Sequence, residues 1–115
     1  MKKILYSPDA VEKLQEIKQD IRIKYGKQKA NKIIKNLLKA IGGLRIYENK
    51  GPSVEDLTGV ICDYRIIFTE HNYVFYKIDK SEILIVDMYN EKEDFMWKLI
   101  GIKTRTKETE DYWNE

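Results

Sequence analysis

The chain has 115 residues, of which 43% are hydrophobic and 35% are charged, and its formal net charge is +2. These values are typical of one globular domain, and no apolar run approaches the roughly twenty residues that span a bilayer. One cysteine and one histidine supply neither a disulfide nor a metal cluster, so we expect no cofactor. The first residues lack the apolar centre of a secretory signal, which predicts a cytoplasmic protein without a membrane segment.

Charged residues are unevenly distributed along the chain. Residues 21–47 contain eight basic residues and no acidic one, whereas residues 63–94 contain eight acidic and four basic residues. A positive segment of this kind attracts acidic partners, and the attraction weakens as salt is added. The sequence therefore predicts that an acidic partner segment binds to residues 21–47.

The N-terminal segment predicts a strand followed by a helix. Residues 3–6 are typical of a short strand. Ser7 can cap the next turn, Pro8 has the φ angle of a first helical position, and Asp9 favours the positive end of the helix dipole. Apolar residues then recur every three or four positions until a glycine interrupts them, so we expect a helix over residues 8–25.

A second and wider apolar stripe predicts another helix over residues 27–47, with lysines on its other side. The stripe consists of Ala30, Ile33, Ile34, Leu37, Leu38, Ile41 and Leu44. Because only about two residues separate the helices, they should form an antiparallel hairpin that packs its apolar face on a sheet.

Turn signals divide the remaining sequence. We expect a loop at residues 48–57 and then three strands, which short connections make antiparallel. The strands are predicted at residues 59–68, 73–78 and 82–89. A short helix should follow at residues 93–101, and the polar residues 103–115 should form a flexible tail. One domain would then span residues 1–102, and its fold class is α+β.

Alternation along the strands predicts which side chains face the helices, because successive residues point to opposite faces of a sheet. The expected helix-facing residues are Tyr64, Ile66, Phe68, Val74, Tyr76, Ile78, Leu84, Val86 and Met88. Five residues of the other parity should meet on the opposite face. They are Arg65, Tyr73, Lys77, Asp87 and Tyr89, which combine cations, a carboxylate and phenols.

Several short motifs accompany this order of elements. They are Ser7-Pro8-Asp9-Ala10, Tyr64-Arg65, Asn72-Tyr73 and Tyr76. Because of these motifs and the order of the elements, residues 2–102 resemble the RelE/ParE family of toxins from type II toxin–antitoxin modules. The resemblance implies an N-terminal strand, a helical hairpin, a three-stranded antiparallel sheet and a short C-terminal helix. It also implies a cognate antitoxin as partner. RelE-like members cleave messenger RNA on the ribosome without metal, whereas ParE-like members poison DNA gyrase.

Four residues could serve RNA cleavage. Attack by the ribose 2′-OH needs a proton acceptor, a proton donor and cations that stabilise the phosphate. Arg65 and Lys77 could hold the phosphate, Tyr89 could donate a proton or stack on a base, and Asp87 could accept a proton. RelE-like sequences often carry His or Arg near the end of the last strand. At that place this chain has the run Asn90, Glu91, Lys92 and Glu93.

The sequence therefore leaves three functions open. We predict ribosome-dependent cleavage of messenger RNA, with ribosome and message as partners, because cations and a phenol are expected on one sheet face. Inhibition of DNA gyrase is the alternative that the missing basic residues after Tyr89 favour. The third possibility is a catalytically silent homologue that only binds an antitoxin.

Overall fold

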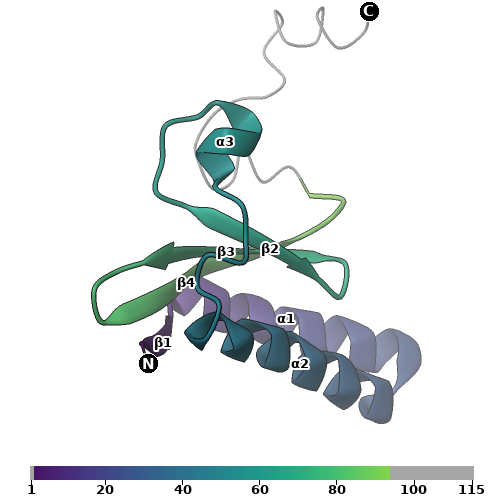
Figure 1. The fold of residues 1–115 in the computed structure, drawn as a ribbon. Coiled ribbons are helices and arrows are strands. Elements are labelled where there is room, and N and C mark those ends of the chain that lie inside the picture. Colours follow the sequence, from purple (N-terminus) through teal and green to yellow (C-terminus); the bar gives the residue numbers. More distant parts are fainter. Residues whose placement is uncertain (1, 94–115) are drawn as a thin grey trace, which may run out of the picture.

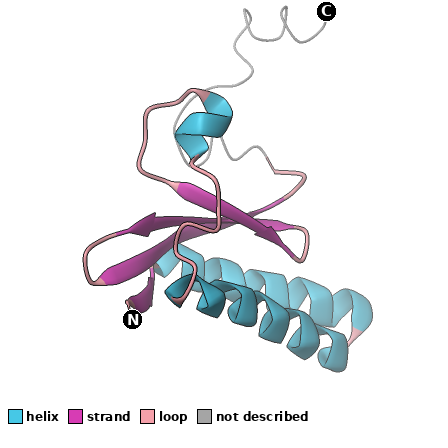
Figure 2. Cartoon of the chain, in the orientation of Figure 1, coloured by secondary structure: helices cyan, strands magenta, loops and turns pink. Residues whose placement is uncertain are grey.

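The computed structural model describes residues 2–93 of the chain. Two long antiparallel helices pack on one face of a four-stranded sheet, and a short helix lies on the other side (Figures 1 and 2). The helices are α1 (Pro8–Tyr25), α2 (Lys27–Gly42) and α3 (Val54–Thr58), with a 3₁₀ turn, η1 (Gly43–Arg45), after α2. The strands are β1 (Lys3–Tyr6), β2 (Arg65–Thr69), β3 (Asn72–Ile78) and β4 (Glu82–Asn90). This arrangement confirms the predicted α+β class.

The sheet has the strand order β1-β4-β3-β2, so β1 and β2 form its two edges. β2, β3 and β4 are antiparallel neighbours, as their short connections predicted. β1 pairs with β4 in parallel, which requires a long crossover connection. The helical hairpin is the first part of that crossover and covers one face of the sheet.

Local signals determine the bounds of α1, which match the prediction at both ends. The Ser7 hydroxyl accepts a hydrogen bond from the Ala10 amide over 3.0 Å, and Pro8 takes the first helical position. The Ser7 amide donates to the Ile85 carbonyl over 2.9 Å, which ties the start of α1 to β4. Gly26 ends the helix at φ 94°, a conformation that favours glycine.

The second helix is shorter than predicted. The sequence pattern suggested residues 27–47, but α2 ends at Gly42 and the chain continues in η1. Consecutive glycines at Gly42 and Gly43 disfavour the α-helix, and the Ile46 amide donates to the Gly43 carbonyl in a tighter turn over 3.1 Å.

The segment between α2 and the sheet also differs from the prediction. Part of the predicted loop, together with Thr58, forms α3, and β2 begins at Arg65 rather than at residue 59. The Ser53 hydroxyl caps α3 by accepting from the Asp56 amide over 3.4 Å. Gly59 then ends the helix at φ 76°. Residues 59–64 connect α3 to β2 without being part of a strand.

A β-bulge changes the parity of β4. Phe75 and Tyr76 are neighbours on β3, but their partners on β4 are Asp87 and Ile85. Val86 is therefore an extra residue in β4. An extra residue moves every side chain on one side of it to the other face, relative to a regular strand.

The bulge makes part of the predicted core wrong. Ile83 and Ile85 belong to the core beneath the helices, where Leu84 and Val86 were expected. Beyond the bulge, Met88 faces the helices as predicted. The three predicted residues of β3 also lie on the helix side. On that side they pack with α1 and α2 residues such as Ala10, Leu37 and Ile41.

The faces of β2 are reversed as well. Ile67 pairs with Val74 and packs in the core beneath the helices, whereas Ile66 packs on the opposite face with Val54 and Phe75. The pairing register decides this, because residues directly opposite each other on neighbouring strands share a face. The sheet consequently has a second, smaller core on the side of α3.

Two predictions fall outside the described residues. They are the helix at residues 93–101, apart from its first residue, and the polar tail at residues 103–115. Within residues 2–93, no helix combines the length and the apolar character needed to cross a membrane.

Candidate functional site

Arg65 lies on the helix-facing side of the sheet, not on the face where it was expected. Its partner on β3 is Tyr76, which is buried beneath the helices. The Arg65 guanidinium donates a hydrogen bond from Nη1 to the carbonyl oxygen of Gly51 over 2.6 Å. This bond holds the loop before α3 against the sheet.

The Tyr76 hydroxyl holds the same loop. It donates to the Glu48 carbonyl over 2.8 Å and accepts from the Gly51 amide over 3.0 Å. Burial raises the pKa of Tyr76, so this phenol is neutral at physiological pH. A Cβ atom at Gly51 would approach the Ile66 carbonyl oxygen to 2.2 Å, so the backbone contact requires glycine. Arg65 therefore has a structural partner in the loop.

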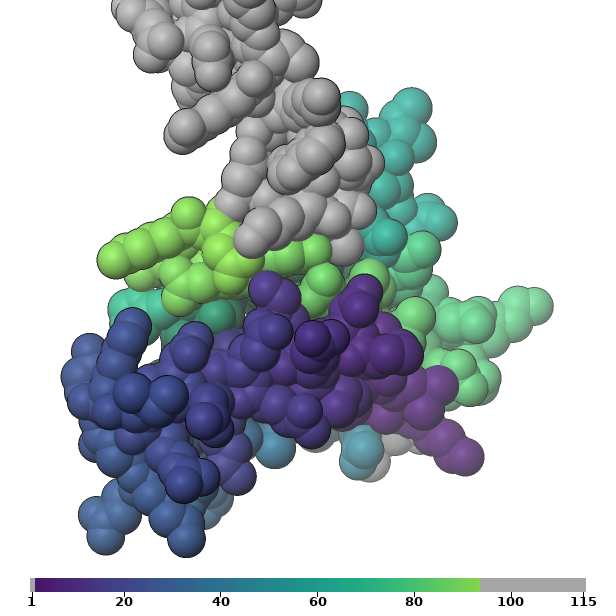
Figure 3. Space-filling model, turned by 180° about the vertical axis from the view of Figure 1, so that it is seen from behind, coloured from purple at the N-terminus to yellow at the C-terminus, as the bar shows by residue number. Residues whose placement is uncertain are grey.

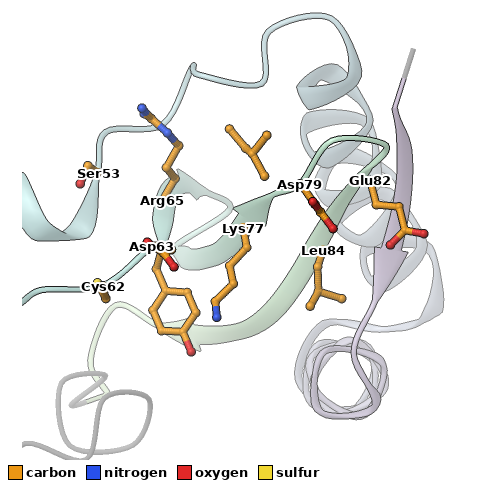
Figure 4. A pocket seen from close by; sticks show the side chains of 10 residues that line it. Ser53, Cys62, Asp63, Arg65, Lys77, Asp79, Glu82 and Leu84 are labelled. Carbon is orange, nitrogen blue, oxygen red and sulfur yellow. The ribbon is translucent and has the colours of Figure 1, made fainter.

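Lys77 points away from Arg65 (Figure 4). Its Nζ atom lies 4.6 Å from the ring centroid of Tyr64, a cation–π contact. Both cations line one open surface pocket of about 560 Å³. The same pocket contains three carboxylates, from Asp63, Asp79 and Glu82. Acidic groups thus outnumber basic ones around Lys77, which disfavours a phosphate there.

Tyr89 and Asp87 form a buried pair at the end of β4. Tyr89 is 4% exposed and Asp87 is 8% exposed. The Tyr89 hydroxyl donates to Asp87 Oδ2 over 2.8 Å, and the Met88 amide donates to Asp87 Oδ1 over 2.7 Å. Burial raises the pKa of Tyr89 far above its ordinary value, and the hydrogen bond and charge of Asp87 raise it further. Tyr89 is therefore a neutral phenol whose proton is engaged.

The surroundings of this pair are also acidic. Tyr89 and Asp87 line a small pocket with Lys13 and three carboxylates of α1, from Asp9, Glu12 and Glu16. The Lys13 ammonium lies 5.2 Å from the Tyr89 ring centroid and 3.4 Å from Glu93 Oε2. Figure 3 shows α1 with the end of β4 beside it on this side of the molecule.

The predicted convergence of five residues on the face away from the helices is therefore wrong for Arg65, which lies on the helix side. Tyr73 and Tyr89 pack on the opposite face, as predicted, and Asp87 shares that face because it pairs with Phe75. Lys77 contacts Tyr64, and the Asp87–Tyr89 pair lies at the part of β4 beside α1. The β2 register accounts for the position of Arg65. What the four residues do in the cell is a separate question, and their predicted roles in RNA cleavage stay predictions.

Two surface features were not found from the sequence. One is an apolar groove between α3 and β2. It could not be expected from the sequence, because residues 48–57 were predicted to form a loop and not a helix. The other is a groove of about 570 Å³ between the helical hairpin and the β2–β3 turn, with Glu16, Asp20, Glu70, Glu91 and Glu93 among its lining residues. Within residues 2–93, no group of three or more His, Cys, Asp or Glu side chains could hold a metal ion.

The basic residues of α2 lie where the helical periodicity placed them. Lys32, Lys35 and Lys39 are exposed, and Leu37 and Ile41 on the opposite side of the helix are buried. None of the ion pairs among the described residues involves these three lysines. They form a positive surface, which we call the α2 lysine face.

Comparison with known proteins identifies the class to which this fold belongs. The family model described as ParE toxin of type II toxin-antitoxin system, parDE, matches residues 4–95. The chain therefore belongs to the ParE toxin family, and it is the toxin component of a toxin–antitoxin module with a cognate antitoxin as partner.

A solved structure shares the fold. Its title is "Chromosomal ParDE TA system from P. aeruginosa", and it aligns with a TM-score of 0.67 and 17% sequence identity. The alignment covers 78% of this chain and 96% of that one. No curated protein matches the sequence.

Proposed function

We propose that this toxin inhibits DNA gyrase in the cytoplasm, as ParE-like members of the family do, and that it does so by binding rather than by cleaving RNA. The observation that carries the proposal is the separation of the residues that RNA cleavage would need. Arg65 is bonded to the Gly51 carbonyl, and Tyr89 donates its proton to Asp87. Each group is thus engaged in a contact within the protein.

Electrostatics supports the same conclusion. Metal-free cleavage of RNA needs cations at the phosphate and a proton donor and acceptor beside it. Around Tyr89 the charged neighbours are Lys13 and the carboxylates of α1. Carboxylates within a Debye length of about 8 Å repel a phosphate backbone. Inhibition by binding needs no such constellation, only an exposed surface that fits the target.

Ribosome-dependent cleavage of messenger RNA is the second candidate, and one observation favours it. Arg65 and Lys77 line the same open pocket, although their side chains point in opposite directions (Figure 4). A phosphate that entered this pocket would displace the Arg65 contact with the loop. Under this hypothesis Arg65→Ala abolishes cleavage.

Brief induction of the toxin in cells separates the two functions. We expect DNA synthesis to stop first, gyrase-linked DNA breaks to accumulate and a reporter message to stay intact by primer extension. Purified toxin should inhibit supercoiling by purified gyrase. Arg22→Ala is a matched control for Arg65→Ala, since Arg22 is exposed on α1.

A different result would contradict gyrase inhibition and support RNA cleavage. New 5′ ends inside translated codons, present in Arg22→Ala and absent in Arg65→Ala, together with unaffected gyrase, would show that the toxin is a ribosome-dependent nuclease.

A further inference from the structure

All eight basic residues within residues 21–47 are exposed to solvent. They extend from Arg22 near the end of α1, along α2, to Arg45 in η1, and no acidic residue lies between them in the chain. Among the described residues, none of the eight takes part in an ion pair. Carboxylates surround Lys77 and Tyr89, so the charge environment of this segment is different. The α2 lysine face is its central part.

Helix stability does not account for the charges of α2. The first long helix, α1, has the arrangement that the helix dipole favours, with Asp9 in its first turn and Arg22 and Lys24 in its last turn. The first turn of α2 has no acidic residue and begins with Lys27, a cation at the positive end of the dipole. The members of the α2 lysine face are three and four residues apart, and like charges at this spacing destabilise a helix. A face that lowers the stability of its own helix indicates a binding role.

The residue types on this face suit a phosphate backbone better than a stable protein interface. Protein interfaces are centred on buried aromatic and Arg anchors and are depleted of Lys, whereas α2 contains neither an aromatic residue nor an arginine. The exposed amides of Gln28 and Asn31 lie one helical turn before Lys32 and Lys35. Lys, Asn and Gln are side chains that contact DNA phosphates. Because α2 has no aromatic ring to stack on a base, the face suits a duplex rather than a single strand.

The length of the face fits a nucleic-acid backbone. Lys32 and Lys39 are seven residues apart, about 10 Å along the axis of the helix. Duplex DNA carries one phosphate charge per about 1.7 Å of its own axis, so a backbone that lies along α2 offers a phosphate to each of the three lysines. The opposite side of α2 packs in the core through Leu37 and Ile41, and the hairpin lies on the outside of the molecule (Figure 1). Contacts to phosphates carry no sequence information.

We propose that the α2 lysine face binds the phosphate backbone of duplex DNA, independently of the DNA sequence. Each lysine that neutralises a phosphate releases counterions, so the affinity falls steeply as salt is added. The choice of DNA over duplex RNA rests on the proposed function, because gyrase acts on DNA. The binding itself goes beyond gyrase inhibition and needs no second protein. The acidic antitoxin segment expected at the same face would compete with DNA.

Fluorescence anisotropy with the full-length toxin and a short labelled DNA duplex tests the proposal in the absence of gyrase and antitoxin. The test variant replaces the three lysines of the α2 lysine face with Gln. The control variant replaces three exposed lysines on β1, on α1 and in the β3–β4 turn with Gln, namely Lys3, Lys18 and Lys80. Both variants lose the same charge, and both should keep the parent circular dichroism spectrum, because Gln and Lys have similar helix propensities.

We expect the test variant to raise the Kd for the duplex by about tenfold or more at low salt, whereas the control variant should change it by less than about threefold. The slope of log Kd against log salt concentration should fall by about 0.9 for each lysine removed from the α2 lysine face. The control variant should keep the slope of the parent.

Four results would overturn the proposal. A parent toxin that binds no DNA at low salt would refute it directly, and equal losses in the two variants would show that only the net charge matters. Binding of the acidic protein encoded by the neighbouring open reading frame through these lysines, without binding of DNA, would make the face a protein docking site. Tighter binding of duplex RNA or of single-stranded DNA of the same length would contradict the choice of duplex DNA. Inhibition of gyrase is measured separately by the supercoiling assay, so either conclusion can fail without the other.

Discussion

At the scale of single residues, the Tyr89–Asp87 pair shows how burial changes the chemistry of a side chain. The Tyr89 phenol is 4% exposed and bonded to Asp87 Oδ2, and burial is the largest cause of its raised pKa. The unfolded chain has an ordinary tyrosine with a pKa of about 10. The neutral form is thus favoured in the folded state.

The sign of the pH dependence follows from this difference. Below about pH 10 the phenol is protonated in both states, and its contribution to stability is complete. Above that pH the unfolded chain releases the proton first, so stability decreases as pH rises toward the raised pKa of the folded state. Tyr6 and Tyr76 also have raised pKa values because they are buried, and they act in the same direction.

Tyr89→Phe should therefore have two effects. At neutral pH it leaves the buried Asp87 carboxylate without one hydrogen bond, which should lower the free energy of unfolding by about 1–3 kcal/mol. Between about pH 9 and pH 11 its stability should fall less steeply than that of the parent. Urea denaturation at each pH measures both. Tyr47→Phe is the control, since Tyr47 is exposed, and parallel pH curves for Tyr89→Phe and the parent would contradict the assignment.

At the scale of elements, α2 separates two neighbouring leucines that sequence reasoning placed in one stripe. Leu37 is 0% exposed and packs in the core beneath the hairpin, whereas Leu38 is 42% exposed. Residues one step apart on a helix are rotated by about 100°. The apolar side of α2 is thus narrower than the stripe in the sequence.

The pair gives a matched stability test. Leu37→Ala should lower the free energy of unfolding by about 2–5 kcal/mol, because it opens a cavity in the core. Leu38→Ala should cost less than about 1 kcal/mol, since a half-exposed site loses little buried surface. Chemical denaturation of both variants compares them directly, and equal losses would mean that the face of α2 has been misassigned.

At the scale of the whole molecule, charge is divided between α2 and the sheet. The α2 lysine face is positive, and the acid-rich segment lies in β2, β3, β4 and their connections. Such a division orients an approaching partner and raises the rate of association at low salt. An acidic antitoxin segment would therefore approach the α2 lysine face.

Charge reversal tests this approach. Replacing Lys32, Lys35 and Lys39 with Glu should slow association with the antitoxin by about tenfold or more at low salt, and the difference should shrink as salt is added. Lys80→Glu is a control, since Lys80 is exposed in the turn between β3 and β4. Stopped-flow measurements give the rates, and an unchanged rate for the triple variant would exclude the α2 lysine face from the encounter.

The sequence alone determined the elements whose signals are local. Ser7 and Pro8 determine where α1 begins, and Gly26 determines where it ends, so each signal lies next to the helix end that it sets. Alternation and short turns likewise predicted β3 and β4 to within one residue at each end. The motifs in their order were sufficient to indicate the family.

Only the tertiary structure decided which side chains meet. The bulge at Val86 is defined by the partners of β4 on β3, and the face of Arg65 by its pairing with Tyr76. The caps of α3 were visible as Ser53 and Gly59, but a helix of five residues has too weak a periodicity to be seen. A one-residue shift between strands exchanges the two faces of a sheet while leaving the hydrophobic pattern almost unchanged. The candidate site depends on that shift, and contacts between distant parts of the chain determine it.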